Sequence, residues 1–512
     1  MIKKILILLL FPFCLLSQDI EHLFLKNGEV YFSFKYKNKE QLDELSKIIS
    51  IDHKTNAEVA YAYANKKEFS EFLKKDIIYQ IIEKKPIYFT KDKSSWNYYP
   101  SYQEYIDMMQ AFADSFPNIC KLHNLGTLNS GRKILIVQIS DNVGKKENEP
   151  SFLYTSSMHG DELAGYVLML RLINELLNNY GSNNRITNLV NEVDIWINPL
   201  ANPDGAYAGG NQDVSNAMRY NASWVDLNRN YPDPQDGMHP DGNSWQQETK
   251  IFMGLADSIN FSLAANLHGG TELVNYPWDT WGQATADENW WEHVSNEYAQ
   301  SCQSNSSSGY FNSQNNGITN GFAWYEVDGG RQDYMNYFKH CREFTLELSD
   351  DKIPNPSQLP VLWNANYNAF LSYMEQSLYG LRGVVTDSIY GFPLKAKIEI
   401  ISHDTDSSHI YSNLPIGNYH RYLYQGNYNI TFSKAGYYSK IINVNITNQN
   451  TEIKDIQLVP LNFVATNKDL KINEKKLMKV INVLGIDTFE KKSSILFYIY
   501  NDGTSEKRII ID

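Results

Sequence analysis

Two residues with metal-binding side chains, His159 and Glu162, stand three positions apart in the segment SFLYTSSMHGDELAGYVLMLRLI, residues 151–173. They occupy a small loop between an apolar, strand-like stretch and a helical one. Because the chain contains 11 histidines, about one His-x-x-Glu pair is expected by chance, and the pair alone assigns no site. A catalytic zinc ion needs three protein ligands and an open position for water. His268, which ends the apolar strand of AANLHGG, is the candidate third ligand.

Three further stretches carry side chains suited to binding an anion and moving a proton. VDLNRNYP places Asn228 beside Arg229, a pairing that can bind a carboxylate in a fork-like manner. Arg219, in NAMRYNASW, is a second candidate cation nine residues before Asn228. Glu347 lies inside the otherwise apolar strand of REFTLELSD, where a carboxylate needs a partner or a chemical task.

The composition is that of a folded protein with more than one domain. The chain has 512 residues, of which 42% are hydrophobic and 21% charged, and this length suggests two to four domains. A net charge of -13 gives no electrostatic footprint for nucleic acid, so we expect no nucleic-acid partner.

The first residues, MIKKILILLLFPFCLLSQDI, have the layout of a secretory signal: two lysines, a short apolar run and then polar residues. We predict a signal peptide over 1–18 and a mature protein that is secreted or held at the cell surface after export through the periplasm. No later stretch reads as a transmembrane segment. Cys120, Cys302 and Cys341 then remain, and one pair of them could form a disulfide outside the cytoplasm.

Patterns of alternation divide the rest of the chain. Residues 19–90 mix strand-like and helix-like stretches and predict a small α+β domain, followed by a lysine-bearing linker. Residues 97–378 alternate near-continuous apolar strands with helical patterns, which predicts a layered α/β domain with helices on both faces of its sheet. Residues 380–460 carry short alternating strands and predict a small all-β sandwich. A tail covers 461–512.

The stretches SSMHGDE, INPLANPDG, RYNASWVDLNRNYP, NLHGG, WYEVDGGRQDY and FTLELSD together resemble the zinc metallocarboxypeptidases of the carboxypeptidase A/B clan, in the order of that family. The resemblance is to the regulatory, carboxypeptidase N/E-like subgroup and covers about 97–460. Residues 380–460 resemble the transthyretin-like module of this subgroup. The tail resembles the C-terminal sorting domains of bacteria with type IX secretion, which implies the secretion machinery as a partner.

The resemblance assigns a role to each candidate residue. It implies one Zn2+ per chain, held by His159, Glu162 and His268. Catalysis would fall to Glu347 as general base, Arg219 as the group that polarises the scissile carbonyl, and Tyr325 as a mobile side chain over the substrate. The substrate, a peptide or protein C-terminal tail, would be held by Asn228 and Arg229 at its carboxylate and by Asp279 and Gln332 at its last side chain, which favours C-terminal Lys or Arg.

The sequence departs from the subgroup at three places. Trp224 stands where glycine is usual, and Arg331 stands in the pocket motif GGRQD where an apolar residue is usual, so Arg331 could neutralise the pocket. The domain over 19–90 is not typical of the subgroup, and it could be a pro-segment that shields the active site or a permanent accessory domain. Three other functions stay open at this stage: a cell-wall peptide carboxypeptidase, an inactive carboxypeptidase fold that only binds C-terminal tails, and a structural or adhesive function of the β-sandwich and the tail.

Overall fold

The computed structural model describes residues 20–24, 28–52, 54–82, 96–307, 309–461, 476–489, 494–501 and 503–509. The predicted signal peptide and most of the predicted linker lie outside these residues. The chain forms two compact units, Met1–Pro460 and Leu461–Asp512, which are considered separately below.

The N-terminal domain, here residues 28–82, is a four-stranded sheet with two helices. Its elements are β1 (Glu29–Lys35), α2 (Lys39–Ser46), β2 (Ser50–Ile51), β3 (Val59–Asn65), α3 (Lys66–Leu73) and β4 (Tyr79–Ile81), and the strand order is β2-β3-β1-β4. Alternation in β1 buries Val30, Phe32 and Phe34 against the helices. A reciprocal capping box between Asn65 and Glu68 starts α3. Because β2 stands at one end of the strand order, it is an edge strand and can contact the next domain.

The central α/β domain, residues 96–378, is built on one mixed sheet of eight strands. In sheet order the strands are β11 (Ile318–Asn320), β10 (Glu272–Tyr276), β12 (Arg342–Leu348), β9 (Leu263–His268), β7 (Ser151–Ser156), β8 (Asp194–Asn198), β6 (Lys133–Ile139) and β5 (Cys120–Thr127). The central strands β12, β9, β7 and β8 are parallel. Every residue of these four strands is buried, because helices cover both faces.

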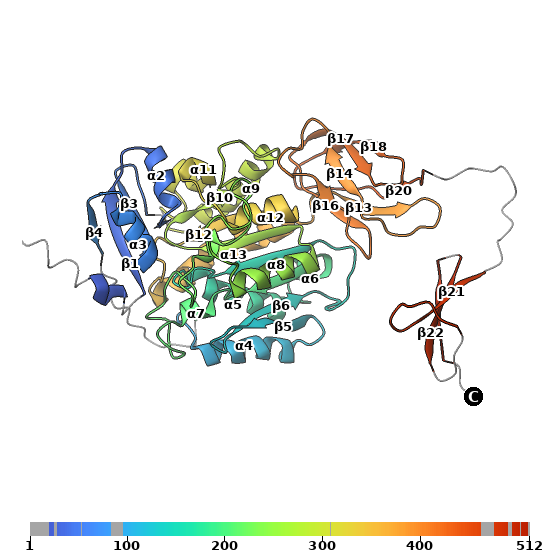
Figure 1. The fold of residues 1–512 in the computed structure, drawn as a ribbon, viewed down its shortest axis with the longest axis horizontal. Coiled ribbons are helices and arrows are strands. Elements are labelled where there is room, and N and C mark those ends of the chain that lie inside the picture. The colour runs from blue at the N-terminus through green and yellow to red at the C-terminus, as the bar shows by residue number, and fades with distance from the viewer. Residues whose placement is uncertain are drawn as a thin grey trace, which may run out of the picture. The chain divides into compact units, whose positions relative to one another are not determined.

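Helices cover both faces of the sheet (Figure 1), and each face has an apolar core of its own. One face carries α4 (Tyr102–Ser115), α5 (Ala164–Asn179), α6 (Asn184–Glu192), α9 (Glu288–Ser304) and α13 (Leu359–Gln376). The other carries α8 (Gln247–Ile259) and α12 (Arg331–Lys339). Short helices lie in the connections: α7 (Pro203–Ala206), η1 (Leu227–Arg229), α10 (Ser313–Gly317), α11 (Gly321–Trp324) and η2 (Pro356–Gln358). This confirms the layered α/β fold predicted from the sequence.

A β-sandwich follows the central α/β domain, as the strand pattern predicts. One sheet holds β16 (Asn418–Arg421), β13 (Gly380–Asp387), β19 (Thr451–Ile453) and β20 (Ile456–Leu458), and the other holds β15 (Ile410–Tyr411), β14 (Lys397–Ile400), β17 (Gly426–Ser433) and β18 (Lys440–Ile446). Arg421 of the sandwich binds both carboxylate oxygens of Asp287, at 2.7 and 3.0 Å, and Asp404 at 2.6 Å. Arg342 binds the same Asp287. A buried ion network thus joins the sandwich to the central α/β domain.

The second unit is a small antiparallel sheet of β21 (Leu477–Asn482), β22 (Ile495–Tyr500) and β23 (Ser505–Ile509). It leaves large apolar side chains on its surface, among them Leu484 and Phe489, which are 78% and 92% exposed. Within the described residues, no helix is both long enough and apolar enough to cross a membrane. Cys120, Cys302 and Cys341 are all buried and unpaired, so the disulfide considered from the sequence is not formed.

Candidate metal centre and its surroundings

The candidate ligands come from the ends of two neighbouring parallel strands. His268 is the last residue of β9, and His159 and Glu162 lie in the loop between β7 and α5. Strands β7 and β9 are paired in parallel, so their carboxyl ends meet at one edge of the sheet. Strand β12 pairs with the other side of β9, in a register that places Glu347 directly beside His268.

Three donor atoms converge at this edge. The Nδ1 atoms of His159 and His268 lie 2.9 and 2.8 Å from Oε2 of Glu162, and 3.1 Å from each other. All three side chains are at least 98% buried. Two imidazole nitrogens and one carboxylate oxygen are a donor set that fits a catalytic zinc ion and leaves a fourth position for water.

Each candidate ligand contacts a supporting polar residue that the sequence motifs did not single out. Asp226 Oδ1 lies 3.0 Å from His159 Nε2, and the side-chain amide of Asn266 lies 2.7 Å from His268 Nε2. Lys352 Nζ donates to the other oxygen of Glu162 at 2.7 Å. Such partners fix the ring orientation and keep Nδ1 directed at the metal position.

One of these supporting residues, Asn266, could have been identified from the sequence. Asn266 is two residues before His268 in the same strand, and side chains at that spacing share a face of the sheet. Lys352 follows β12 in a turn, and nothing in the local pattern relates it to Glu162.

The charges of the centre compensate one another. Burial alone would raise the pKa of Glu162, but His159, Lys352 and His268 outweigh it and hold that pKa well below its usual value. Burial and the charge of Glu162 raise the pKa of the Glu347 carboxyl to about 8, against the opposing effects of His268, Lys352 and His159. A carboxyl with a pKa in that range can both accept and return a proton near neutral pH.

Arg219 lies against the candidate ligands. Its Nε donates to Asp226 Oδ2 at 2.9 Å, and its Nη1 lies 3.1 Å from His159 Nδ1 and 3.3 Å from Glu162 Oε1. The structure therefore places the predicted carbonyl-polarising cation within contact distance of the metal centre.

Asn228 and Arg229 lie on η1, at the wall of the same site. The main-chain N–H of Arg331 donates to Asn228 Oδ1 at 2.9 Å and fixes the amide. Arg229 donates through Nη1 to the Asn228 carbonyl, whereas its buried Nε and Nη2 have no hydrogen-bond partner among the described residues. Two unused guanidinium donors beside a metal centre are suited to binding a carboxylate.

A small cavity joins these groups. Its lining includes Arg229, His268, Asp279, Tyr325 and Glu347, and its volume is about 20 Å³. That volume leaves room for about one water molecule.

Gln332 and Arg331 are the two remaining residues of the predicted pocket. Gln332 is buried but does not line this cavity. Arg331 forms two hydrogen bonds with the carboxylate of Glu343, at 3.2 and 3.1 Å. Glu343 therefore neutralises the positive charge of Arg331 behind the wall of the cavity.

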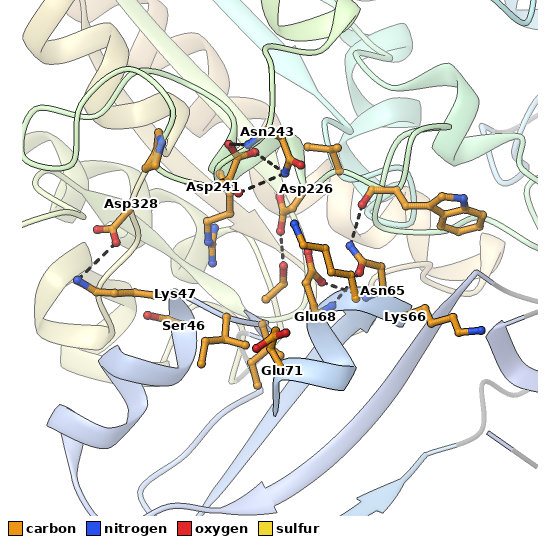
Figure 2. A pocket seen from close by; sticks show the side chains of 18 of the residues that line it. Ser46, Lys47, Asn65, Lys66, Glu68, Glu71, Asp226, Asp241, Asn243 and Asp328 are labelled. Atoms are coloured by element: carbon orange, nitrogen blue, oxygen red, sulfur yellow. Dashed lines mark hydrogen bonds and ion pairs between the residues drawn. The ribbon is translucent and has the colours of Figure 1, made fainter. Parts of the chain in front are cut away.

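The N-terminal domain covers this site. Ser50 Oγ donates to Asp226 Oδ2 at 2.5 Å, Tyr220 OH donates to Glu68 Oε2 at 2.6 Å, and Asn65 Nδ2 donates to the Trp224 carbonyl. Figure 2 shows the contacts of Asp226 and Asn65 at the edge of a cavity of about 1040 Å³ between the two domains. The predicted mobile residue Tyr325 is 3% exposed and packs into the apolar core of the N-terminal domain.

Trp224, where glycine was expected, also belongs to this contact. Its φ is 61°, in the left-handed region that favours glycine. The indole ring lies so close to Gly28 that a Cβ on Gly28 would be 1.4 Å from a ring carbon. The contact with the N-terminal domain thus offsets the unfavourable backbone conformation.

Comparisons with known proteins agree with this geometry. The family model described as zinc carboxypeptidase matches residues 105–369. The chain is 33% identical over 381 residues to carboxypeptidase D of Mus musculus, covering 71% of this chain but only 27% of that relative. It is 31% identical to the carboxypeptidase N catalytic chain of Rattus norvegicus, covering 70% of this chain and 85% of that one.

Two solved structures share the fold. Carboxypeptidase A from Helicoverpa armigera superposes with a TM-score of 0.54 at 18% identity, covering 69% of this chain and 97% of that one. Thrombin activatable fibrinolysis inhibitor gives a TM-score of 0.52 at 14% identity, covering 68% and 98%.

The support that Asp226 gives to His159 can be tested through metal affinity. We expect Asp226→Asn to weaken zinc binding by about 10- to 100-fold, because the amide orients the imidazole less strongly than the carboxylate. Competition with a chromogenic chelator measures this. Asp236→Asn removes an exposed carboxylate from the same cavity and is the matched control. Equal affinity in both variants would contradict the role of Asp226.

Proposed function

This chain belongs to the zinc carboxypeptidase family, and we propose that it hydrolyses the C-terminal peptide bond of peptides or proteins, with a preference for C-terminal Lys or Arg. One observation carries the proposal. A single cavity is lined by the unused donors of Arg229, by the base Glu347 beside the candidate ligand His268, and by the buried carboxylate of Asp279. These groups match the terminal carboxylate, the scissile bond and the last side chain of such a substrate.

The proposed roles follow from where each group lies. Zinc, held by His159, Glu162 and His268, would supply a Lewis acid that activates water at neutral pH. Glu347 takes a proton from the attacking water and returns it to the leaving amine. Arg219 donates to the oxygen of the scissile carbonyl as negative charge develops there.

Anchoring of the substrate explains why only the last bond would be cut. Asn228 and Arg229 bind a free carboxylate, which internal peptide bonds lack. Asp279 is 3% exposed and receives a hydrogen bond from Asn275 at 3.0 Å. With Arg331 engaged by Glu343, no cation in the described structure neutralises Asp279 from that side, which supports binding of a basic side chain.

The N-terminal domain supports a second part of the proposal, that residues 19–90 are a pro-segment that keeps the enzyme inactive. A cavity of about 20 Å³ cannot hold a lysine side chain. Tyr63 of β3 lies over Lys352, with the ammonium 4.6 Å from the ring centroid, and Glu29 accepts from the main-chain N–H of Arg219 at 3.2 Å. The domain thus contacts residues on both sides of the candidate ligands.

We further propose that the protein is exported and that its domains divide as the sequence predicts. A signal peptide over 1–18 would be removed, 97–378 would form the catalytic domain and 380–460 a transthyretin-like sandwich. The tail over 461–512 would be a sorting domain for type IX secretion. The apolar side chains exposed in the connection after β21, such as Phe489, support a segment that functions by binding another protein.

Substrate preference is tested with peptides that differ only in the last residue. We expect zinc-dependent release of the last residue, and Asp279→Ala should lower kcat/KM for Lys- and Arg-ending peptides by about a hundredfold while apolar-ending ones change little. Glu347→Gln should abolish turnover and retain zinc, which separates loss of the base from loss of the metal. A wild-type preference for apolar ends, or no turnover by any form, would overturn the proposal.

Inhibition by the N-terminal domain is tested by cutting the linker over 84–100. We expect the cut and separated enzyme to be more active than the intact chain, by about tenfold for every 1.4 kcal/mol of docking free energy. Activity is measured on one peptide before and after limited proteolysis and gel filtration. Equal activity in the two forms would leave residues 19–90 as an accessory domain.

Export is tested by deleting residues 461–512. Because the tail forms a compact unit of its own, the truncated enzyme should keep its activity but accumulate in the periplasm. Activity measured in periplasmic and extracellular fractions shows this. Unchanged secretion of the truncated chain would refute the sorting role.

A further inference from the structure

A second buried carboxyl, Asp333, lies directly behind Asp279. It is completely buried in the first turn of α12. Its Oδ2 accepts the main-chain N–H groups of Asp279 at 3.0 Å and Thr280 at 2.8 Å, and its Oδ1 also faces the Asp279 N–H at 3.2 Å. Asp333 therefore holds the stretch of main chain that carries the Asp279 carboxylate.

The same loop is fixed on its other sides. The carbonyl of Asp279 accepts from the N–H of Val327 at 3.1 Å, and Thr280 Oγ1 donates to Asp233 at 3.0 Å. Gly321 makes room for the Asp279 side chain, since a Cβ there would lie 1.7 Å from Oδ1. The position of the carboxylate is thus set by its surroundings, with little freedom to move away from Asp333.

The charges that surround Asp279 are mostly of its own sign. They are Asp333 from α12, Asp233 from the segment before α8, Glu347 from β12, and one cation, Arg229 from η1. Asp233 accepts hydrogen bonds from main-chain N–H groups, among them that of Gly329 at 2.9 Å. Arg229 is the group that would bind the substrate carboxylate. Among the described residues, Asp279 and Asp333 accordingly have no nearby cation other than Arg229.

We propose, on the basis of the function proposed above, that Asp333 is a positioning residue of the specificity pocket: it fixes the main chain of Asp279, and the two buried carboxyls together hold one proton that leaves to water when a lysine or arginine side chain enters. The incoming cation then compensates the negative charge that the proton had neutralised. Two neighbouring carboxyls in a buried site do not both ionise readily without such a partner.

The direction of the pH dependence follows from the environment of the pair. Burial, together with Asp233 and Glu347, raises the pKa of Asp279 to about 7 against the opposing effects of Asn275 and Arg229. Burial and the charge of Asp279 raise the pKa of Asp333 as well. A basic side chain binds the deprotonated form of Asp279, so selectivity for basic ends should rise as pH increases through about 7.

The test is the ratio of kcat/KM for a Lys-ending peptide to that for the matching Leu-ending peptide, between pH 5.5 and 8.5. The ratio cancels the titration of Glu347 and of metal-bound water, because both peptides need them equally. The assay uses the zinc-loaded chain in the form, intact or cut in the linker, that shows turnover. At pH values below the midpoint of its pH dependence, the wild-type ratio should rise by about tenfold for each unit of increasing pH.

Asp333→Asn keeps the shape of the side chain and removes its charge. We expect the midpoint of the ratio to move to lower pH by about one unit, because Asp279 then ionises without a like charge behind it. Asp257→Asn is the matched control: it removes an exposed carboxylate that pairs with Lys339 at the other end of α12, and it should leave the midpoint unchanged. An unchanged midpoint in Asp333→Asn, or an equal loss on both peptides, would overturn the proposal.

A measurement that leaves Asp279 and Asp333 unchanged covers the case in which Asp333→Asn does not fold. Glu347→Gln, which should bind but not cleave, is titrated with the Lys-ending peptide at pH 6 in buffers of different ionisation enthalpy. We expect release of close to one more proton than with the Leu-ending peptide, and equal release for the two would overturn the inference. A wild-type enzyme with no preference for Lys would instead refute the proposed specificity itself.

Discussion

The parallel pairing of β7, β9 and β12 is the constraint on which the rest of the site depends. It brings the carboxyl ends of three strands to one edge of the sheet, and with them His159, His268 and Glu347. The register is fixed because these strands are buried on both faces, so that a shift by one residue would place apolar and polar side chains on the wrong sides. A metal centre built from loop residues alone would lack this precision.

Because that edge is buried, its charged side chains need partners of opposite charge, and the structure supplies them. Asp226 is the central group, since its two oxygens meet His159, Arg219 and Ser50. Burial would raise its pKa, yet Arg219 and His159 hold the pKa well below the usual value. Removing one member of such a network leaves a buried charge without compensation, and that is costly. The catalytic face therefore requires its outer partners as much as its ligands.

The N-terminal domain uses the same network. It contacts Asp226 through Ser50, Arg219 through Glu29 and Lys352 through Tyr63, so it docks on residues that orient the ligands. Docking there closes the cavity without displacing any ligand from the others. At the far end of the catalytic domain, the Arg421–Asp287 network fixes the sandwich by a similar buried pairing. Both neighbours of the catalytic domain are thus attached through charges rather than apolar surface alone.

The sequence by itself determined the layered fold, the family and the residues that converge at the metal centre. Apolar runs and their spacing are local properties, and the motifs carry their chemistry in adjacent positions, so both can be recognised without coordinates. Only the tertiary structure showed that Asp226 and Lys352 support the ligands and that Arg331 is neutralised by Glu343. It also showed that the cysteines stay apart, that Gln332 lies outside the cavity, and that Asp333 lies behind Asp279. Each of these facts is a relation between side chains that the chain path brings together from distant elements. Neither periodicity nor motif spacing encodes such a relation, because it depends on how strands and helices pack.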